Sequence, residues 1–99
     1  MAVKHVNVAD YRELIDACFQ SHRDCYACVG DFEQRQGINF LRCHVADLKD
    51  ATCKRVSARD KERASEAIRS CEFLIRTKQQ QFDSADVAYT RMAFAGEWK

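Results

Sequence analysis

Hydrophobic residues recur along the chain at alternating steps of three and four, which is the period of one face of an α-helix. In the first half of the chain, one such series consists of Tyr11, Ile15, Cys18, His22, Cys25, Val29 and Phe32. A second, less apolar series consists of Phe40, Cys43, Ala46 or Asp47, Asp50 and Cys53, with Leu41, Val45 and Leu48 close by. No useful length of sequence alternates as a strand would, and the chain has no proline and only three glycines. The pattern predicts an all-α protein.

Capping residues give the expected bounds of the first helix. Asp10, followed three residues later by Glu13, is a start of the capping-box type. The helix is expected to end at Gly30 or Gly37, and we favour fraying after Gly30 and a turn over Arg35–Gly37. Residues 1–9 have no helical pattern and are expected to form an extended N-terminal arm.

Two further helices are expected to follow. Asn39 can cap the second helix, and Ser57 with Asp60 forms a new capping box, so the second helix should stop near Val56. The third helix, about 58–81, is long and carries a solvated face of mixed charge. Its apolar stripe consists of Ala64, Ala67, Ile68, Cys71, Leu74 and Ile75.

Two cysteine pairs share one spacing, because Cys18 and Cys28, and then Cys43 and Cys53, each enclose nine residues. A ten-residue step falls about 80° short of three helical turns, so each pair lies on roughly one face, about 15 Å apart along the axis. Folding the helices back on each other sets Cys28 opposite Cys43 and Cys18 opposite Cys53, within disulfide range. We predict two disulfides that clamp a helical hairpin over 10–56; the alternative is free, buried thiols.

This twin spacing resembles the twin Cys-x9-Cys family, the coiled-coil-helix-coiled-coil-helix (CHCH) domains of mitochondria, over about Asp10–Val56. The resemblance implies trapping in the mitochondrial intermembrane space by oxidation, with an import oxidoreductase as a partner during biogenesis. It does not imply a single function, because the family includes respiratory-chain subunits, mitochondrial ribosome subunits, metallochaperones and assembly factors.

Cys25 and Cys71 lie outside the twin spacing. Cys25 falls within about 20° of Cys18 on the helix and should face inward, while Cys71 lies on the third apolar stripe. A third bridge from Cys25 to Cys71 and two free buried thiols both remain open. The Cys-x-x-Cys formed by Cys25 and Cys28 also allows a redox pair, or a zinc site with Cys43–His44. Its mid-helix position, and the competing use of Cys28 and Cys43 in a disulfide, argue against both.

Composition narrows the function classes. Acidic and basic residues are interleaved to a net charge of +1, which argues against strong binding to nucleic acid or anionic lipid. At 99 residues the chain is one domain, small enough that cross-links would help its core. We see no secretory signal, no Arg-rich transit peptide and no stretch as long as a membrane span. The sequence has no nucleophile elbow, phosphate-binding loop or zinc-protease motif, so we predict no catalytic residue, cofactor or metal.

The C-terminal helical extension, 57–99, ends in a short helix that Asp83 or Ser84 would cap and Gly96 would end. Large apolar side chains are concentrated there at Tyr89, Met92, Phe94 and Trp98. They either fold back onto the hairpin or bind a partner in a larger assembly.

The expected function is a non-catalytic, structural accessory subunit of a mitochondrial respiratory-chain complex, with complex I favoured and cytochrome c oxidase next. The chain would lie on the intermembrane-space side, peripheral to the inner membrane, with other subunits of the complex as partners. A cross-linked hairpin is stiff before it docks, so less ordering entropy is lost on binding. The alternatives are a soluble assembly factor or metallochaperone for cytochrome c oxidase, and a subunit of the mitochondrial ribosome.

Overall fold

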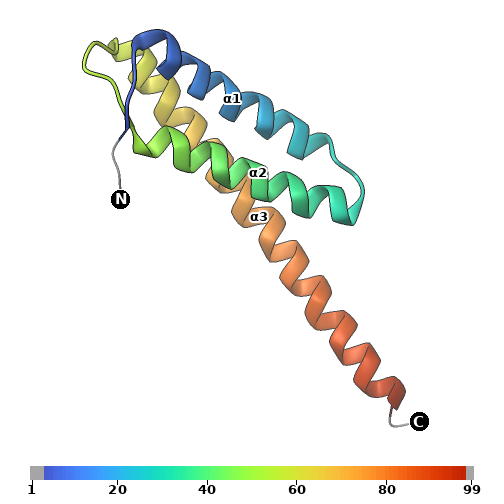
Figure 1. The fold of residues 1–99 in the computed structure, drawn as a ribbon. Coiled ribbons are helices and arrows are strands. Elements are labelled where there is room, and N and C mark those ends of the chain that lie inside the picture. The colour runs from blue at the N-terminus through green and yellow to red at the C-terminus, as the bar shows by residue number, and fades with distance from the viewer. Residues whose placement is uncertain (1–3, 98–99) are drawn as a thin grey trace.

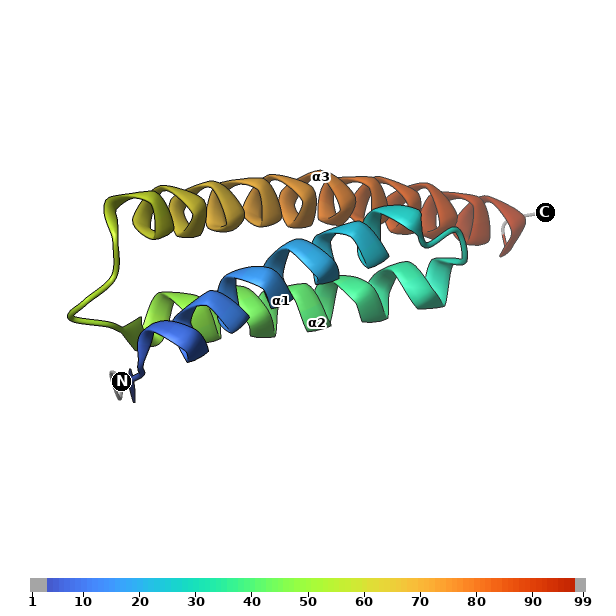
Figure 2. The ribbon, with the colours of Figure 1, turned by 90° about the horizontal axis from the view of Figure 1, so that it is seen from above.

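The computed structural model describes residues 4–97, except for the side chains of Thr90 and of residues 92–97. Its elements are β1 (Lys4–His5), α1 (Val8–Ala27), α2 (Asp31–Asp50), β2 (Ala51–Thr52) and α3 (Ala58–Glu97). Helices α1 and α2 form an antiparallel hairpin, and α3 lies along the hairpin and continues past its turn (Figures 1 and 2). The predicted all-α class and the helical hairpin are confirmed, whereas the disulfide clamp is not shown, since the cysteines of this structure are free thiols.

Helix α1 begins earlier than predicted. The side-chain carbonyl of Asn7 accepts a hydrogen bond from the backbone N–H of Asp10 at 2.8 Å, so Asn7 is the N-cap and the helix starts at Val8. Asp10 instead lies in the first turn, where its negative charge is favourable at the positive end of the helix dipole. At the other end, α1 stops at Ala27 and the backbone N–H of Cys28 closes the last turn.

The turn of the hairpin is also earlier than predicted. Gly30 is the N-cap of α2, so the turn expected over Arg35–Gly37 and the cap expected at Asn39 are both wrong. Gly37 lies inside α2, where a Cβ atom would meet the Cys25 sulfur at 3.3 Å. Glycine costs a helix about 1 kcal/mol relative to alanine, and here it allows the two helices to approach closely.

Helix α2 buries a different face from the one predicted. Its buried side chains are Ile38, Leu41, Val45 and Leu48. In the predicted inward series, Phe40 is 57% exposed and Cys43 is also exposed. The two series are offset by one or two positions, and each position rotates the face by about 100°. Burying branched aliphatic side chains is more favourable than burying a series that includes charged aspartates.

Helix α3 confirms the predicted capping box and stripe but not the predicted break. The backbone N–H of Asp60 donates to the Ser57 hydroxyl at 3.1 Å, and Ala64, Ala67, Cys71 and Leu74 are buried. The helix then runs without interruption to Glu97, although a new helix was expected at Asp83 or Ser84. Residues with capping side chains are tolerated inside a helix when their side chains face solvent, as both do here.

The N-terminal arm is held by a short parallel strand pair, which the sequence pattern did not predict. Lys4 pairs with Ala51 and His5 with Thr52, and the Val6 N–H donates to the Thr52 carbonyl at 2.9 Å. Because this pairing begins directly after α2, the second helix ends at Asp50 and not near Val56.

One hydrophobic core joins all three helices, so the hairpin and the C-terminal extension are not packed separately. The buried members from α1 are Ile15, Cys18 and Cys25, and those from α2 and α3 include Leu41, Leu48, Ala67 and Cys71. Helix α1 runs parallel to α3 and α2 runs antiparallel to it (Figure 2). None of the helices formed by residues 4–97 combines the length and apolar composition needed to cross a lipid bilayer.

Candidate functional site

All six cysteines lie within the described part of the chain, and all are free thiols. Three of them, Cys18, Cys25 and Cys71, are buried in the core between the helices. Cys28 and Cys53 are half-buried, and Cys43 is exposed. The thiols therefore divide into a buried group and a group accessible to solvent. The twin spacing had grouped them differently, with Cys18 among the paired cysteines and Cys25 and Cys71 outside the pairs.

The helix packing brings neither predicted disulfide pair together. Cys25 faces Gly37, and the Cys18 thiol donates to the His44 carbonyl at 3.3 Å. In this antiparallel register, the α1 residue level with Cys43 lies nine positions before Cys28, which corresponds to about 13 Å along the axis. Cys43 also points outward, so Cys28–Cys43 would require a different packing of α2.

Cys53 is likewise distant from Cys18, measured along the axis of α1. It lies near Tyr11, close to the start of α1, where burial and then the charge of Cys53 raise the pKa of Tyr11. Cys18 is about two helical turns further along α1. The pairing of Cys18 with Cys53 and of Cys28 with Cys43 thus stays a prediction for the oxidised protein and is not a feature of this arrangement.

Cys18 and Cys71 are in direct contact across the interface of α1 and α3. The Cys71 thiol donates to the backbone carbonyl of Cys18, with 3.5 Å between the sulfur and the oxygen. When Cys18 ionises, the Cys71 thiol can donate to the Cys18 sulfur instead, and this hydrogen bond lowers the pKa of Cys18 and outweighs burial. The same hydrogen bond, followed by burial, raises the pKa of Cys71 far above its usual value. Cys18 is therefore the thiol of this pair that loses its proton first as the pH rises.

Cys25 and Cys28, the two ends of the Cys-x-x-Cys, have different surroundings. Cys25 is buried against Gly37, and burial raises its pKa. Cys28 follows the last turn of α1, where its thiol donates to the Asp24 carbonyl at 3.1 Å. Residues 4–97, as far as their side chains are described, contain no group of three or more histidine, cysteine or acidic side chains that could hold a metal ion.

The core-facing stripe of α3 continues beyond the hairpin. Phe82 is only 6% exposed and lies under the Arg35 guanidinium, whose central carbon is 4.4 Å from the ring centre. Seven residues later, Tyr89 points within about 20° of the same direction and is 75% exposed. Of the other predicted partner-binding residues, Met92 and Phe94 are in α3 with their side chains outside the described part, and Trp98 lies outside the described residues.

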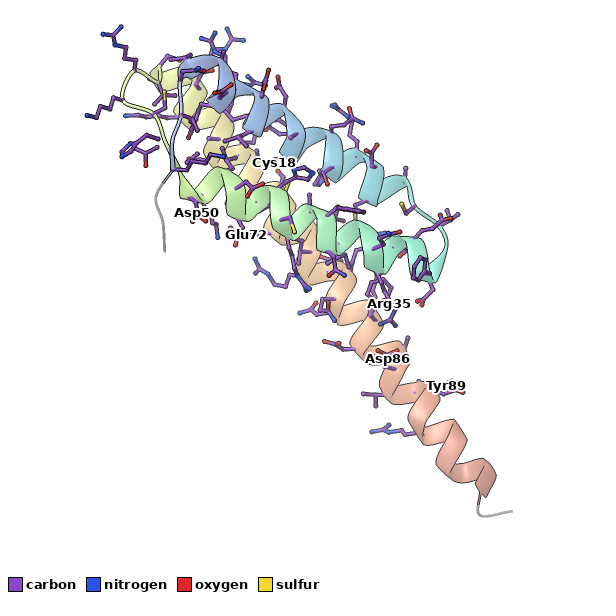
Figure 3. All side chains as sticks on the ribbon, viewed as in Figure 1. Cys18, Arg35, Asp50, Glu72, Asp86 and Tyr89 are labelled. Carbon is purple, nitrogen blue, oxygen red and sulfur yellow. The ribbon has the colours of Figure 1, made fainter. Side chains whose placement is uncertain are left out.

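The turn of the hairpin carries a second group of exposed apolar side chains, consisting of Tyr26, Val29 and Phe32. The sequence pattern placed Val29 and Phe32 on a buried face, which is wrong because α1 ends at Ala27. Arg35, in the first turns of α2, bonds to Asp86 of α3 at 2.9 Å. This contact joins the first turns of α2 to the part of α3 about one turn before Tyr89, as Figure 3 shows for the labelled Arg35, Asp86 and Tyr89.

We call this end of the molecule the docking end and define it by Tyr26, Val29, Phe32, Val87 and Tyr89, all of them exposed.

No family model matches the chain, and no curated protein or solved structure matches it either. The fold itself places the chain among three-helix, all-α proteins in which one helix extends past the other two.

Proposed function

We propose that the protein is a non-catalytic subunit that binds a neighbouring protein of a larger assembly through its docking end. The observation that carries this proposal is the continuation of the α3 core stripe from the covered Phe82 to the uncovered Tyr89. A stripe that packs against the hairpin over most of its length offers the same kind of surface to a partner at its end. Tyrosine is a frequent anchor in interfaces, because its ring buries a large area and its hydroxyl keeps a polar partner.

The contacts at the base of the docking end favour binding without a large ordering cost. Arg35 bonds to Asp86 on α3 and to Asp31 on its own helix, and it covers the Phe82 ring. These contacts hold α3 at a defined angle to the hairpin turn before a partner arrives. A preorganised surface loses less conformational entropy on binding than a flexible one.

A second, more specific proposal concerns which assembly the protein belongs to. It is supported by the spacing of Cys18, Cys28, Cys43 and Cys53. We propose a respiratory-chain complex of the mitochondrial inner membrane, complex I before cytochrome c oxidase, with the chain peripheral on the intermembrane-space side. An import oxidoreductase would then act on the chain during biogenesis. An assembly factor or metallochaperone for cytochrome c oxidase, and a mitochondrial ribosome subunit, are the alternatives to be separated by experiment.

Fractionation followed by native-gel proteomics tests both levels of the proposal. A subunit co-migrates with a complex of very high mass, whereas an assembly factor or metallochaperone stays small and a ribosomal protein sediments with ribosomal RNA. Replacing Tyr89 with Ser should release the protein from its complex. Phe73→Ser is the matched control, since Phe73 is also an exposed aromatic residue of α3 but lies outside the docking end.

Two results would contradict the proposal. If the wild-type protein runs only as a monomer in every fraction, it is not a stable subunit. If Tyr89→Ser and Phe73→Ser behave alike, the docking end is not the binding surface. A self-associating protein would be recognised by the mass of the purified chain in analytical ultracentrifugation.

A further inference from the structure

The contact between Cys18 and Cys71 joins α1 to α3, two helices that the two disulfides of the twin spacing leave unlinked. Both side chains are fully buried, with 0% exposure, and they come from α1 and α3. The 3.5 Å separation between the Cys71 sulfur and the Cys18 carbonyl oxygen places one sulfur against the backbone of the other cysteine. The twin spacing had assigned Cys18 to Cys53 and had offered Cys71 only to Cys25.

We propose that Cys18 and Cys71 are a disulfide site, and that oxidation of this pair covalently joins α1 to α3. The interface around the pair is built from small side chains, including Ala64 and Ala67, which are both buried. Small side chains let helix axes approach to the short end of the usual range of about 8–10 Å, where facing Cα atoms are within the reach of a disulfide. Because the Cys71 sulfur already lies at the level of Cys18, the bond needs no change of register.

Cys18 is a better partner for Cys71 than Cys25 is. Seven residues separate Cys18 from Cys25 on α1, which places them about 10 Å apart along the axis. The Cys71 thiol donates its hydrogen bond at the level of Cys18. Cys25 lies instead against Gly37 of α2, and its pKa is influenced by the charge of Lys78, about two turns beyond Cys71 on α3.

Hydrogen peroxide is the simplest oxidant for this pair, because it is small enough to enter when the helices open locally. The thiolate of Cys18 attacks one peroxide oxygen, so that a sulfur–oxygen bond forms while the oxygen–oxygen bond breaks. The hydroxide that leaves takes up the proton lost from Cys18 and becomes water. The Cys71 sulfur then attacks the Cys18 sulfur, and the departing oxygen leaves with the Cys71 proton as a second water. Two electrons pass from the two thiols to the peroxide.

The disulfide would enclose the whole of α2. Residues between positions 18 and 71 form the closed loop, and α2 (Asp31–Asp50) lies inside it. Helix α3 could then no longer separate completely from α1, even in a partly unfolded chain. This inference does not depend on the proposed function, because it concerns the core and not the docking end.

Peptide mapping of the full chain tests the pairing directly. The reduced protein is treated with hydrogen peroxide in subdenaturing urea, the remaining thiols are alkylated, and trypsin is added without reduction. Trypsin places Cys18 in the peptide 13–23, Cys71 in 70–76, and Cys25 together with Cys28 in 24–35. We expect 13–23 to be linked to 70–76, and this link to be absent from Cys71→Ser but retained in Cys25→Ser.

The Cys25→Ser variant also provides a second measurement. Its oxidised form should melt roughly 10 °C or more above its reduced form, since a long closed loop is restricted in the unfolded chain. A link from 13–23 to the peptide containing Cys53 would overturn the proposal in favour of the twin-spacing pairs. A link from 24–35 to 70–76, or complete alkylation of Cys18 and Cys71 after oxidation, would overturn it as well.

Discussion

Asp60 of α3 accepts a hydrogen bond from the Arg12 guanidinium of α1, with 3.0 Å between Nε and Oδ2. The Asp60 carboxylate is buried, and its backbone N–H donates to Ser57 in the capping box that begins α3. Asp60 therefore takes part in the start of α3 through its backbone N–H and joins α3 to α1 through its carboxylate. Burial would raise the pKa of Asp60, but hydrogen bonds from Arg12 and Ser57, and then the charges of Arg12 and Arg63, hold it below its usual value.

This pKa predicts a loss of stability in acid. A carboxyl group whose pKa is lower in the folded protein than in the unfolded chain stabilises the fold above the unfolded value, about 3.9. That contribution is lost as the pH falls through the folded value. We expect the Tm of the wild-type protein to drop as the pH falls below about 4, and Asp60→Asn to reduce this drop while lowering the Tm at pH 7. Thermal melts at several pH values measure both; identical acid profiles would show that other carboxylates dominate.

Gly37 should be the least replaceable glycine of the hairpin. A valine there would place its branched side chain against the Cys25 sulfur and backbone, where a Cβ atom alone already lies at 3.3 and 3.5 Å. We expect Gly37→Val to lower the free energy of unfolding by about 1–3 kcal/mol, the usual effect of overpacking.

Gly30→Ala is the control for this variant, because a Cβ at Gly30 meets only the flexible Glu33 side chain, at 3.6 Å. Its effect in urea denaturation should be small. Equal destabilisation by Gly37→Val and Gly30→Ala would mean that the two helices are not closely packed at Gly37.

Phe82 should contribute more to stability than any exposed aromatic residue of α3. It is almost fully buried, under the Arg35 guanidinium, near the end of the part of α3 that packs against the hairpin. Truncation of a buried phenylalanine typically costs about 3–5 kcal/mol, so Phe82→Ala should unfold at clearly lower urea concentration. Phe73→Ala, with 66% of the side chain exposed, should shift the midpoint little. Near-equal midpoints for the two variants would place Phe82 outside the core.

Arg35 is expected to control the order of the docking end and not the stability of the whole fold. Its ion pairs with Asp31 and Asp86 are exposed, and exposed pairs contribute only about 0–1 kcal/mol. Arg35→Gln should therefore leave the Tm nearly unchanged while speeding amide hydrogen exchange in α3 after Phe82. Unchanged exchange in that segment would show that α3 holds its position without Arg35.

The third helix could be predicted from the sequence because its local signals agree with its packing. Ser57 and Asp60 form the capping box that the spacing indicates, and the apolar stripe through Cys71 and Leu74 is buried. The break expected at Asp83 or Ser84 is absent because both side chains face solvent, where they do not compete with the helix.

The hairpin was harder to predict in detail because its decisive contacts are tertiary. Gly37 is a helix breaker in isolation and becomes favourable only where Cys25 approaches it. The series that contained Cys43 competed with one containing Leu41, and periodicity alone does not decide which of two neighbouring faces is buried. The contact of Cys18 with Cys71 depends on how α1 lies on α3, and no spacing in the sequence encodes that.

The strand pair of Lys4–His5 with Ala51–Thr52 fixes the position of the N-terminal arm at one end of the hairpin. It fastens the beginning of the described chain to the end of the hairpin opposite its turn, about 30 Å away along a 20-residue helix, whereas α3 continues past the turn (Figure 1). A fluorophore or affinity label fused ahead of Lys4 would thus emerge at the end of the hairpin away from the docking end. Labelled protein could be followed into an assembly while the side chains of the docking end stay free to bind a partner.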